Sequence, residues 1–288
     1  MNSFLFYDDL VQNFEGFVPN ACKLVDPVFM DGKQKFLNES DYGNWYNKKY
    51  PKNLYVEHLL KTDHFEKKYF GGLSVSELEK ITHAATQNEI KSIIFDWDRT
   101  LSVCEGFLNV QFLLKEWNME LDTFFQHLIP YLLGGTKRNQ AIKSMFMALS
   151  ESVPHVFIIT NNPEPTMSEM VKFLLKYLKT PDNFQPVFIQ KNRYSNQSKA
   201  TMLQIHIRTQ SSMPLEDKNE LTEGFFGRPY VDFSKNNHPS PTLFPSSSSS
   251  SSSSSRYRST KKGGRILRKN KQSKKIRRKY TQKKYTHS

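Results

Sequence analysis

Two acidic residues one position apart, Asp96 and Asp98, follow a short apolar run and are the clearest sign of chemistry in this chain. Two carboxylates this close repel each other unless a cation lies between them or their pKa values separate. Mg²⁺ prefers oxygen ligands and commonly binds one or two carboxylates together with a substrate phosphate. A carboxylate also attacks phosphorus to form an aspartyl-phosphate. The pair therefore indicates magnesium-assisted phosphoryl transfer, and the alternative is two acids in an exposed loop.

The chemistry needs rigid elements to hold these groups, and the hydrophobic pattern supplies them. Residues 92–95 form a wholly apolar run, as expected for a buried parallel strand. Residues 155–160 and 186–189 predict two further strands, and residues 198–207 predict a helix. This alternation predicts an α/β fold with a doubly wound parallel sheet between residues 92 and 207. Ligands of such sheets bind outside the carboxyl ends of the strands, where the two acids stand.

Other helices are predicted from capping residues and apolar stripes. Residues 53–70 carry a helical pattern, and Ser74 with Glu77 forms a possible capping box for a helix that ends near Gln87. An apolar stripe from Met167 to Leu178 predicts a helix after the second strand. After Arg208 the pattern fades into polar, turn-rich sequence.

Residues 93–101 read Ile-Ile-Phe-Asp-Trp-Asp-Arg-Thr-Leu. This resembles the first motif of the haloacid dehalogenase (HAD) superfamily, an apolar strand followed by Asp-x-Asp-x-Thr/Val-Leu/Val. The resemblance implies that Asp96 attacks a phosphoryl group, while Asp98 protonates the leaving oxygen and then activates water. It also implies Mg²⁺ bound by the Asp96 carboxylate and the Asp98 backbone carbonyl. Thr100 is then expected to contact the substrate.

The second and third HAD motifs have candidates in the expected order. Thr160 ends the second strand, so by resemblance its hydroxyl binds a phosphoryl oxygen and Asn161 lies beside the substrate. The alternative for Thr160 is a residue that caps the following turn. Lys199, at the start of the helix after the third strand, would neutralise charge on the transferring phosphoryl group. Lys191 is a rival for this role.

The fourth motif of the family is an apolar strand ending in two acids, often with an Asn or Asp a few residues on. Downstream of residue 207 the best candidate is Asp232, predicted as a metal ligand, in the segment Pro229–Asn236. It has only one acid, and a loop residue is the alternative. Glu216-Asp217 is a rival without a preceding strand. Either the site is degenerate, or the end of the domain is rearranged.

These patterns divide the chain into four parts. They are an N-terminal extension (1–89), a HAD-like core (90–235), a serine-rich linker (236–255) and a disordered basic tail (256–288). The core contains a small helical cap insert at about 103–152. Arg138 in this insert is a candidate clamp for a substrate phosphate or carboxylate, or else a helix-surface residue.

The charge of the chain is concentrated in the tail. The net charge is +13, and residues 256–288 contain 15 Lys and Arg without an acid, which leaves residues 1–255 at −2. We expect this tail to bind nucleic acid through its phosphates without reading sequence, or to act as a nuclear-import signal or solubiliser. Its Gly-Gly and Arg/Lys-rich composition resembles tails on proteins of large DNA viruses.

The remaining composition favours an intracellular protein. Cys22 and Cys104 stand far apart in no metal-type spacing, which predicts a reducing compartment. The first residues lack the basic region of a secretory signal, and no apolar run approaches the roughly 20 residues that span a bilayer. Two hypotheses result. The first is a Mg²⁺-dependent phosphohydrolase for an unidentified phosphorylated substrate. The second is a catalytically weak HAD-fold protein that associates with nucleic acid or a virion through its tail.

Overall fold

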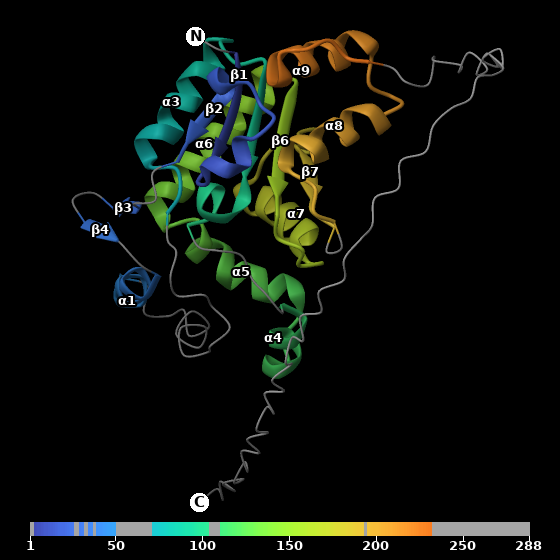
Figure 1. Ribbon diagram of the computed structural model, residues 1–288. Coiled ribbons are helices and arrows are strands. Elements are labelled where there is room, and N and C mark those ends of the chain that lie inside the picture. Colours follow the sequence, from blue (N-terminus) through green and yellow to red (C-terminus); the bar gives the residue numbers. More distant parts are fainter. Residues whose placement is uncertain are drawn as a thin grey trace, which may run out of the picture. The chain divides into compact units, whose positions relative to one another are not determined.

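A computed structural model describes residues 3–25, 29–31, 34–36, 39–49, 71–103, 110–192 and 195–231, all within one compact unit, Met1–Asn236 (Figure 1). The strands are β1 (Phe4–Asp8), β2 (Cys22–Leu24), β3 (Phe29–Asp31), β4 (Gln34–Phe36), β5 (Ser92–Asp96), β6 (His155–Thr160) and β7 (Val187–Gln190). The α-helices are α1 (Glu39–Lys49), α3 (Val75–Thr86), α4 (Val110–Trp117), α5 (Leu121–Leu132), α6 (Thr136–Ser152), α7 (Met167–Leu178), α8 (Lys199–Thr209) and α9 (Leu215–Phe226). Three short turns of helix are η1 (Val11–Phe14), η2 (Pro19–Ala21) and η3 (Trp97–Leu101).

Five of the strands form an all-parallel sheet in the order β2-β1-β5-β6-β7. The predicted strands β5, β6 and β7 are therefore present and adjacent. Parallel strands need long crossover connections, and these place helices on both faces of the sheet. The described part of the chain is thus an α/β protein, as predicted. The strands β3 and β4 form a separate antiparallel pair.

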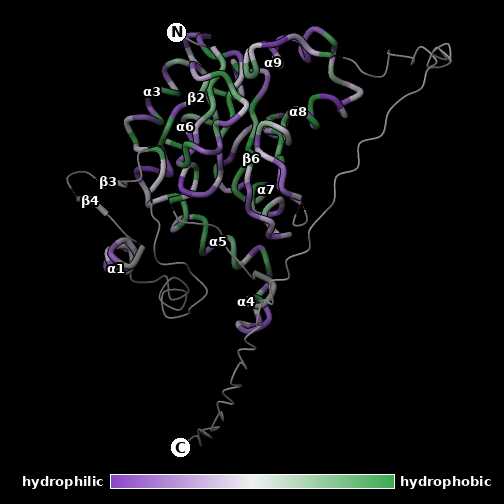
Figure 2. The backbone as a smooth tube through the Cα atoms, in the orientation of Figure 1, coloured by the Kyte–Doolittle hydropathy of each residue, from purple (hydrophilic) through white to green (hydrophobic). Residues whose placement is uncertain are grey.

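Alternation along the strands explains why both faces are covered. In β5, Ile93 and Phe95 belong to one core cluster, whereas Ile94 belongs to a second. Buried residues of α3, α6 and α7 pack in the first cluster, and those of α8 and α9 pack in the second. Figure 2 shows the corresponding concentration of hydrophobic residues in the strands and alternation along the helices. Among the described residues, no helix is long and apolar enough to cross a membrane.

Two predicted helices are confirmed, together with the capping box and the apolar stripe from which they were predicted. The side chain of Ser74 accepts a hydrogen bond from the Glu77 N–H at 3.2 Å, and Glu77 accepts one from the Ser74 N–H at 2.7 Å. This is the predicted capping box, and α3 ends at Thr86. The apolar stripe of α7 is buried against the sheet, as the sequence indicated.

The predicted division at residue 90 differs from the structure. The strand β1 does not belong to an extension, because it pairs with β5 from Phe4↔Ser92 to Tyr7↔Phe95. The segment 90–235 therefore lacks two strands of its own sheet. The helix predicted at 53–70, the linker and the basic tail lie outside the described residues.

Three helices also have a different place from the one predicted. The predicted cap insert at 103–152 includes α6, but Ile142, Phe146 and Leu149 of this helix pack in the core cluster that covers the sheet. α5 also contributes buried residues to this cluster, Phe125 and Leu128 among them, so the described helices of the predicted insert do not form a separate cap. The polar sequence after Arg208 contains α9, which contributes Leu221 and Phe225 to the second core cluster.

Candidate active site at the carboxyl edge of the sheet

Three strands deliver polar side chains to one edge of the sheet. The strands β1, β5 and β6 end at Asp8, Asp96 and Thr160, each of which is at least 97% buried. Because Asp96 is paired with Ile159, Thr160 comes directly beside the end of β5. The prediction that the strands carrying Asp96 and Thr160 are adjacent is confirmed. Burial of this many polar groups at one edge marks a candidate site.

Lys199 ties two of these strand ends together. Its Nζ lies 2.5 Å from Asp96 Oδ1 and 2.6 Å from Asp8 Oδ2, and its side chain is 1% exposed. The lysine occupies the first position of α8, where the Ser198 hydroxyl caps the helix by accepting from the Thr201 N–H. The structure therefore brings Lys199 to Asp96. The rival, Lys191, is half-buried and binds the Thr160 carbonyl through its backbone N–H.

Asp98 lies in the η3 turn that follows Asp96. Its Oδ2 accepts a hydrogen bond from the Thr160 hydroxyl at 3.1 Å. The same hydroxyl oxygen accepts from the Asn162 N–H at 3.0 Å, which fixes the direction in which Thr160 donates. Asp96, Asp98, Thr160 and Lys199 therefore converge, as the sequence predicted. Asp98 is half-buried, whereas Asp96 is nearly inaccessible.

Sequence reasoning missed two acids of the site, Asp8 and Asp9. Asp8 is fully buried, and its Oδ1 accepts from the Leu10 N–H at 2.9 Å and from Asn13 Nδ2 at 2.8 Å. The signal was present, since residues 4–9 read Phe-Leu-Phe-Tyr-Asp-Asp, an apolar strand ending in two acids with an Asn four residues on. It was missed because the resemblance led us to expect a strand ending in two acids only after residue 207.

Asp9 pairs with an arginine of the η3 turn. Its Oδ2 lies 2.7 Å from Arg99 Nη2, and the two side chains are 4% and 12% exposed. Burial raises the pKa of Asp9 to about 6, although Arg99 lowers it. Arg99 adopts a left-handed backbone with φ of 56°. The turn after β5 is thereby joined to the turn after β1.

The charges of the site leave a place for a divalent cation. Four carboxylates (Asp8, Asp9, Asp96, Asp98) lie with two cationic side chains (Lys199, Arg99), so these six described side chains, when ionised, sum to a charge of −2. Oxygens of the first three lie within 4.8 Å of one another and could hold a metal ion. Burial raises the pKa of Asp96 well above its ordinary value, against the effect of Lys199, and Asp8 and Asp98 raise it further. A divalent cation would reverse this shift.

The predicted metal ligands were Asp96, Asp98 and Asp232, and the clustered acids are Asp8, Asp9 and Asp96. Asp96 belongs to both sets, whereas Asp98 was expected to contribute its backbone carbonyl. Asp232 lies outside the described residues. The rival pair Glu216-Asp217 lies in the first turn of α9, where Asp217 approaches His155 at the opposite end of β6.

Arg138 has a different role from the predicted substrate clamp. Its side chain is 1% exposed and donates hydrogen bonds to the carbonyls of Leu73, Thr100, Leu101 and Leu133 at 2.7–3.0 Å. A guanidinium engaged in this way is neither a surface group nor a group directed at substrate. It fixes the backbone before α3, at the end of the η3 turn and at the end of α5.

The remaining predicted substrate residues lie beside the site. Thr100 is buried, and its hydroxyl has no hydrogen-bond partner among the described residues. Asn161 follows Thr160, and its Nδ2 donates to Asn13 Oδ1 at 3.3 Å. Asn13 in turn donates to Asp8, so the turns after β1 and β6 are linked to each other. No contact with a substrate is implied by these bonds.

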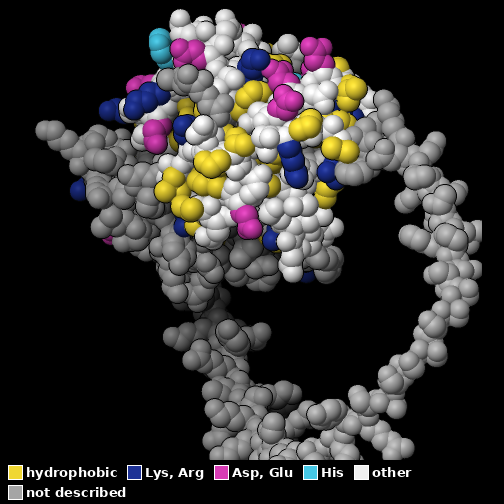
Figure 3. Space-filling model, turned by 45° about the horizontal axis from the view of Figure 1, so that its top comes forward, with side chains coloured by type: hydrophobic (Ala, Val, Ile, Leu, Met, Phe, Trp, Pro, Cys, Tyr) yellow, Lys and Arg dark blue, Asp and Glu magenta, His cyan; other side chains and the backbone are white. Residues whose placement is uncertain are grey.

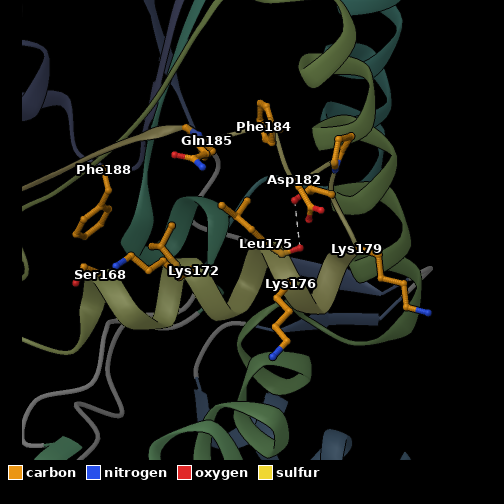
Figure 4. Close-up of a pocket in the computed structure, with 13 residues that line it drawn as sticks. Ser168, Lys172, Leu175, Lys176, Lys179, Asp182, Phe184, Gln185 and Phe188 are labelled. Carbon is orange, nitrogen blue, oxygen red and sulfur yellow. Dashed lines mark hydrogen bonds between the residues drawn. The ribbon is translucent and has the colours of Figure 1, made fainter.

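A separate groove of about 700 Å³ runs along α7 and the segment from Thr180 to Phe188. Phe184 and Phe188 lie on one side of it, and Lys176 points away from them (Figure 4). None of the converging acids, Thr160 or Lys199 lines this groove. It is therefore distinct from the candidate active site.

Comparisons with known proteins assign no family to this chain. No protein-family model, no curated protein and no solved structure matches the chain.

Proposed function

We propose that the chain is a Mg²⁺-dependent phosphohydrolase of the HAD type that works through an aspartyl-phosphate on Asp96. The observation that carries the proposal is the bridge from Lys199 to Asp96 and Asp8 at one sheet edge. It joins the nucleophile of the first motif, the lysine of the third and a buried strand that ends in two acids. Such a strand is the fourth motif of the family.

The proposal includes a changed motif order along the chain. Asp8 and Asp9 supply the fourth motif before the first motif at Asp96 and Asp98. Thr160 and Lys199 then follow in the usual order. Under this proposal the fourth motif is complete without a further strand, and the described residues from 208 to 231 contain none. Asp232 is not needed as a ligand under this proposal.

Each of the converging side chains has its own role in the proposed reaction. An Asp96 oxygen forms a bond to phosphorus as the bond to the leaving oxygen breaks, and Asp98 gives that oxygen a proton. Asp98 then takes a proton from the water that attacks phosphorus, which releases phosphate and restores Asp96. Lys199 offsets negative charge on the phosphoryl group, and the Thr160 hydroxyl holds Asp98 in place. Mg²⁺ held by Asp8, Asp9 and Asp96 would supply further charge neutralisation.

A panel of phosphomonoesters assayed with and without Mg²⁺ tests the proposal. We expect turnover that depends on Mg²⁺ and is abolished in Asp96→Asn, because a neutral amide does not attack phosphorus. The matched control is Asp217→Asn, an acid more than a third exposed in α9 at the other end of the sheet, which should keep wild-type turnover. Residual activity of Asp96→Asn within about tenfold of wild type would contradict the assignment, since loss of a nucleophile costs several orders of magnitude.

A second candidate function rests on the basic sequence 256–288. We propose that this segment binds nucleic acid through phosphates, whether or not the site is active. The face of the described body in Figure 3 offers no comparable basic field, because basic, acidic and apolar side chains are interspersed on it.

Deletion of residues 256–288 tests this second function. It removes 15 positive charges and should nearly abolish DNA and RNA binding, while turnover of a small phosphomonoester stays the same. For every phosphate that the shortened chain no longer neutralises, the slope of log affinity against log salt should fall by roughly 0.7–0.9. Equal polynucleotide affinity of the truncated and full chains would place the binding surface on the α/β body instead.

A further inference from the structure

The metal site of the proposed function contains a cation of its own, the guanidinium of Arg99. Arg99 Nη2 is 2.7 Å from Asp9 Oδ2, and Asp9 is one of three acids whose oxygens lie within 4.8 Å of one another. A carboxylate has two oxygens, so Asp9 is able to bind Arg99 with one and a metal ion with the other. The arginine therefore shares a ligand with the ion.

The backbone of Arg99 has a conformation that favours glycine. Its φ of 56° lies in the left-handed region, which side chains other than glycine adopt at an energetic cost. Glycine at this position would avoid that cost. The chain instead carries an arginine whose side chain is 12% exposed, against an acid that is 4% exposed. The guanidinium therefore places a positive charge directly beside the acidic cluster.

We infer that Arg99 sets the affinity of the Asp8–Asp9–Asp96 cluster for its divalent cation, by acting as a fixed counter-cation that keeps the ion exchangeable. This inference rests on the proposed function, because it takes these three acids as the ligands. Arg99 adds one positive charge beside the three acids, through its contact with Asp9. Without it the same acids attract a divalent ion more strongly.

A competing role for Arg99 predicts the opposite sign. If Arg99 only orients Asp9, its loss frees the carboxylate and weakens metal binding. Coulomb repulsion between a divalent ion and a buried guanidinium on the same carboxylate, even at an effective dielectric constant of about 20, exceeds the net contribution of one charge-assisted hydrogen bond. The electrostatic effect should therefore dominate, and Arg99→Gln should bind the ion more tightly.

Binding of Mg²⁺ and Mn²⁺ to the full chain, measured by calorimetry and by Mn²⁺ paramagnetic resonance without substrate, tests the inference. We expect the dissociation constant to fall at least about tenfold in Arg99→Gln, equivalent to about 1.4 kcal/mol. Arg99→Lys keeps the charge and should stay within about threefold of wild type. The matched control is Lys91→Gln, which removes one cation from an exposed pair with Glu220 and should leave the constant unchanged.

The outcomes separate this inference from the proposed function. Weaker or equal binding in Arg99→Gln, with normal binding in wild type, overturns the role of Arg99 and leaves the metal site intact. Binding in Arg99→Gln but not in wild type supports the inference in its strongest form. Absence of binding in every variant overturns both. If Arg99→Gln does not fold, Arg99→Gly replaces it, because glycine suits the left-handed backbone and also removes the charge.

Discussion

The two ends of the parallel sheet hold lysine–carboxylate pairs of the same length in opposite environments. At the carboxyl edge, Lys199 lies 2.6 Å from Asp8, and the two side chains are 1% and 0% exposed. At the amino edge, Lys91 lies 2.6 Å from Glu220, and the side chains are 60% and 40% exposed. Distance alone therefore does not identify a functional pair. Burial does, because a buried charge without its partner is costly while an exposed one is solvated.

The neighbours of each pair support the same distinction. Lys199 contacts a second carboxylate, Asp96, in a cluster that no single pair neutralises. The amino edge instead has separate contacts that attach α9, including His155 Nε2 at 3.6 Å from Asp217. One end of the sheet concentrates buried acids, and the other places separate contacts at a solvated surface. Among the described residues, the first arrangement brings together three acids that could hold a metal ion.

The largest expected difference between the ends is the effect of removing each lysine. Lys199→Met leaves Asp8 and Asp96 buried without their cation, and should lower the free energy of unfolding by about 3–5 kcal/mol. Lys91→Met breaks an exposed pair and should change it by less than about 1 kcal/mol. Urea unfolding of both variants without metal measures the difference.

Addition of Mg²⁺ should affect the stability of the two lysine variants differently. It should restore part of the stability of Lys199→Met, because it supplies a cation to the same acids, and should have no additional effect on Lys91→Met relative to wild type. An equal loss of unfolding free energy in the two lysine variants would show that Lys199 contributes no more to stability than Lys91.

A smaller effect is expected from His206, on the same helix as Lys199. Its ring packs edge-on against Phe157 near the start of β6, and burial lowers its pKa. The unfolded state then binds the proton more readily than the folded state. The contribution of neutral His206 to stability is therefore complete above the ordinary value of about 6.5 and decreases as the pH falls below it.

His206→Gln tests this pH dependence. The variant should lose less stability than wild type between pH 7.5 and pH 5.5, when the midpoint of thermal unfolding is measured at both values. Exposed His83, on α3, provides the control variant His83→Gln, which should follow wild type. An unchanged pH dependence in His206→Gln would show that protonation of this ring is not linked to unfolding.

The central strands and the core of the site could be predicted because local pattern and environment agree there. β6 was predicted at its observed bounds, and β5 within one residue, since both are apolar runs buried on two faces. The predicted site residues were found because each ends or follows such a strand, or begins a helix after one. They are Asp96, Asp98, Thr160 and Lys199.

The missed elements show what local pattern does not contain. β1 has the same apolar pattern as β5, but its place between β2 and β5 depends on pairing with a strand 88 positions later in the sequence. Asp8 and Asp9 were missed with it. α9 was missed because it buries few apolar residues, Leu221 and Phe225 among them, within a polar segment. The buried carbonyl contacts of Arg138 come from three separate segments, which no spacing in the sequence indicates.

The bond between Lys199 and Asp8 spans 191 positions of the chain, which has a consequence for folding during synthesis. On the ribosome, β1 (Phe4–Asp8) emerges well before both its neighbour β5 and Lys199, the residue that neutralises Asp8. Until then an apolar strand has an unpaired edge, the kind of segment that chaperones bind and that aggregates when left exposed. Nascent chains stopped before β5 should therefore remain protease-sensitive in β1, and the acidic site is complete only after α8 has brought Lys199 to Asp8 and Asp96.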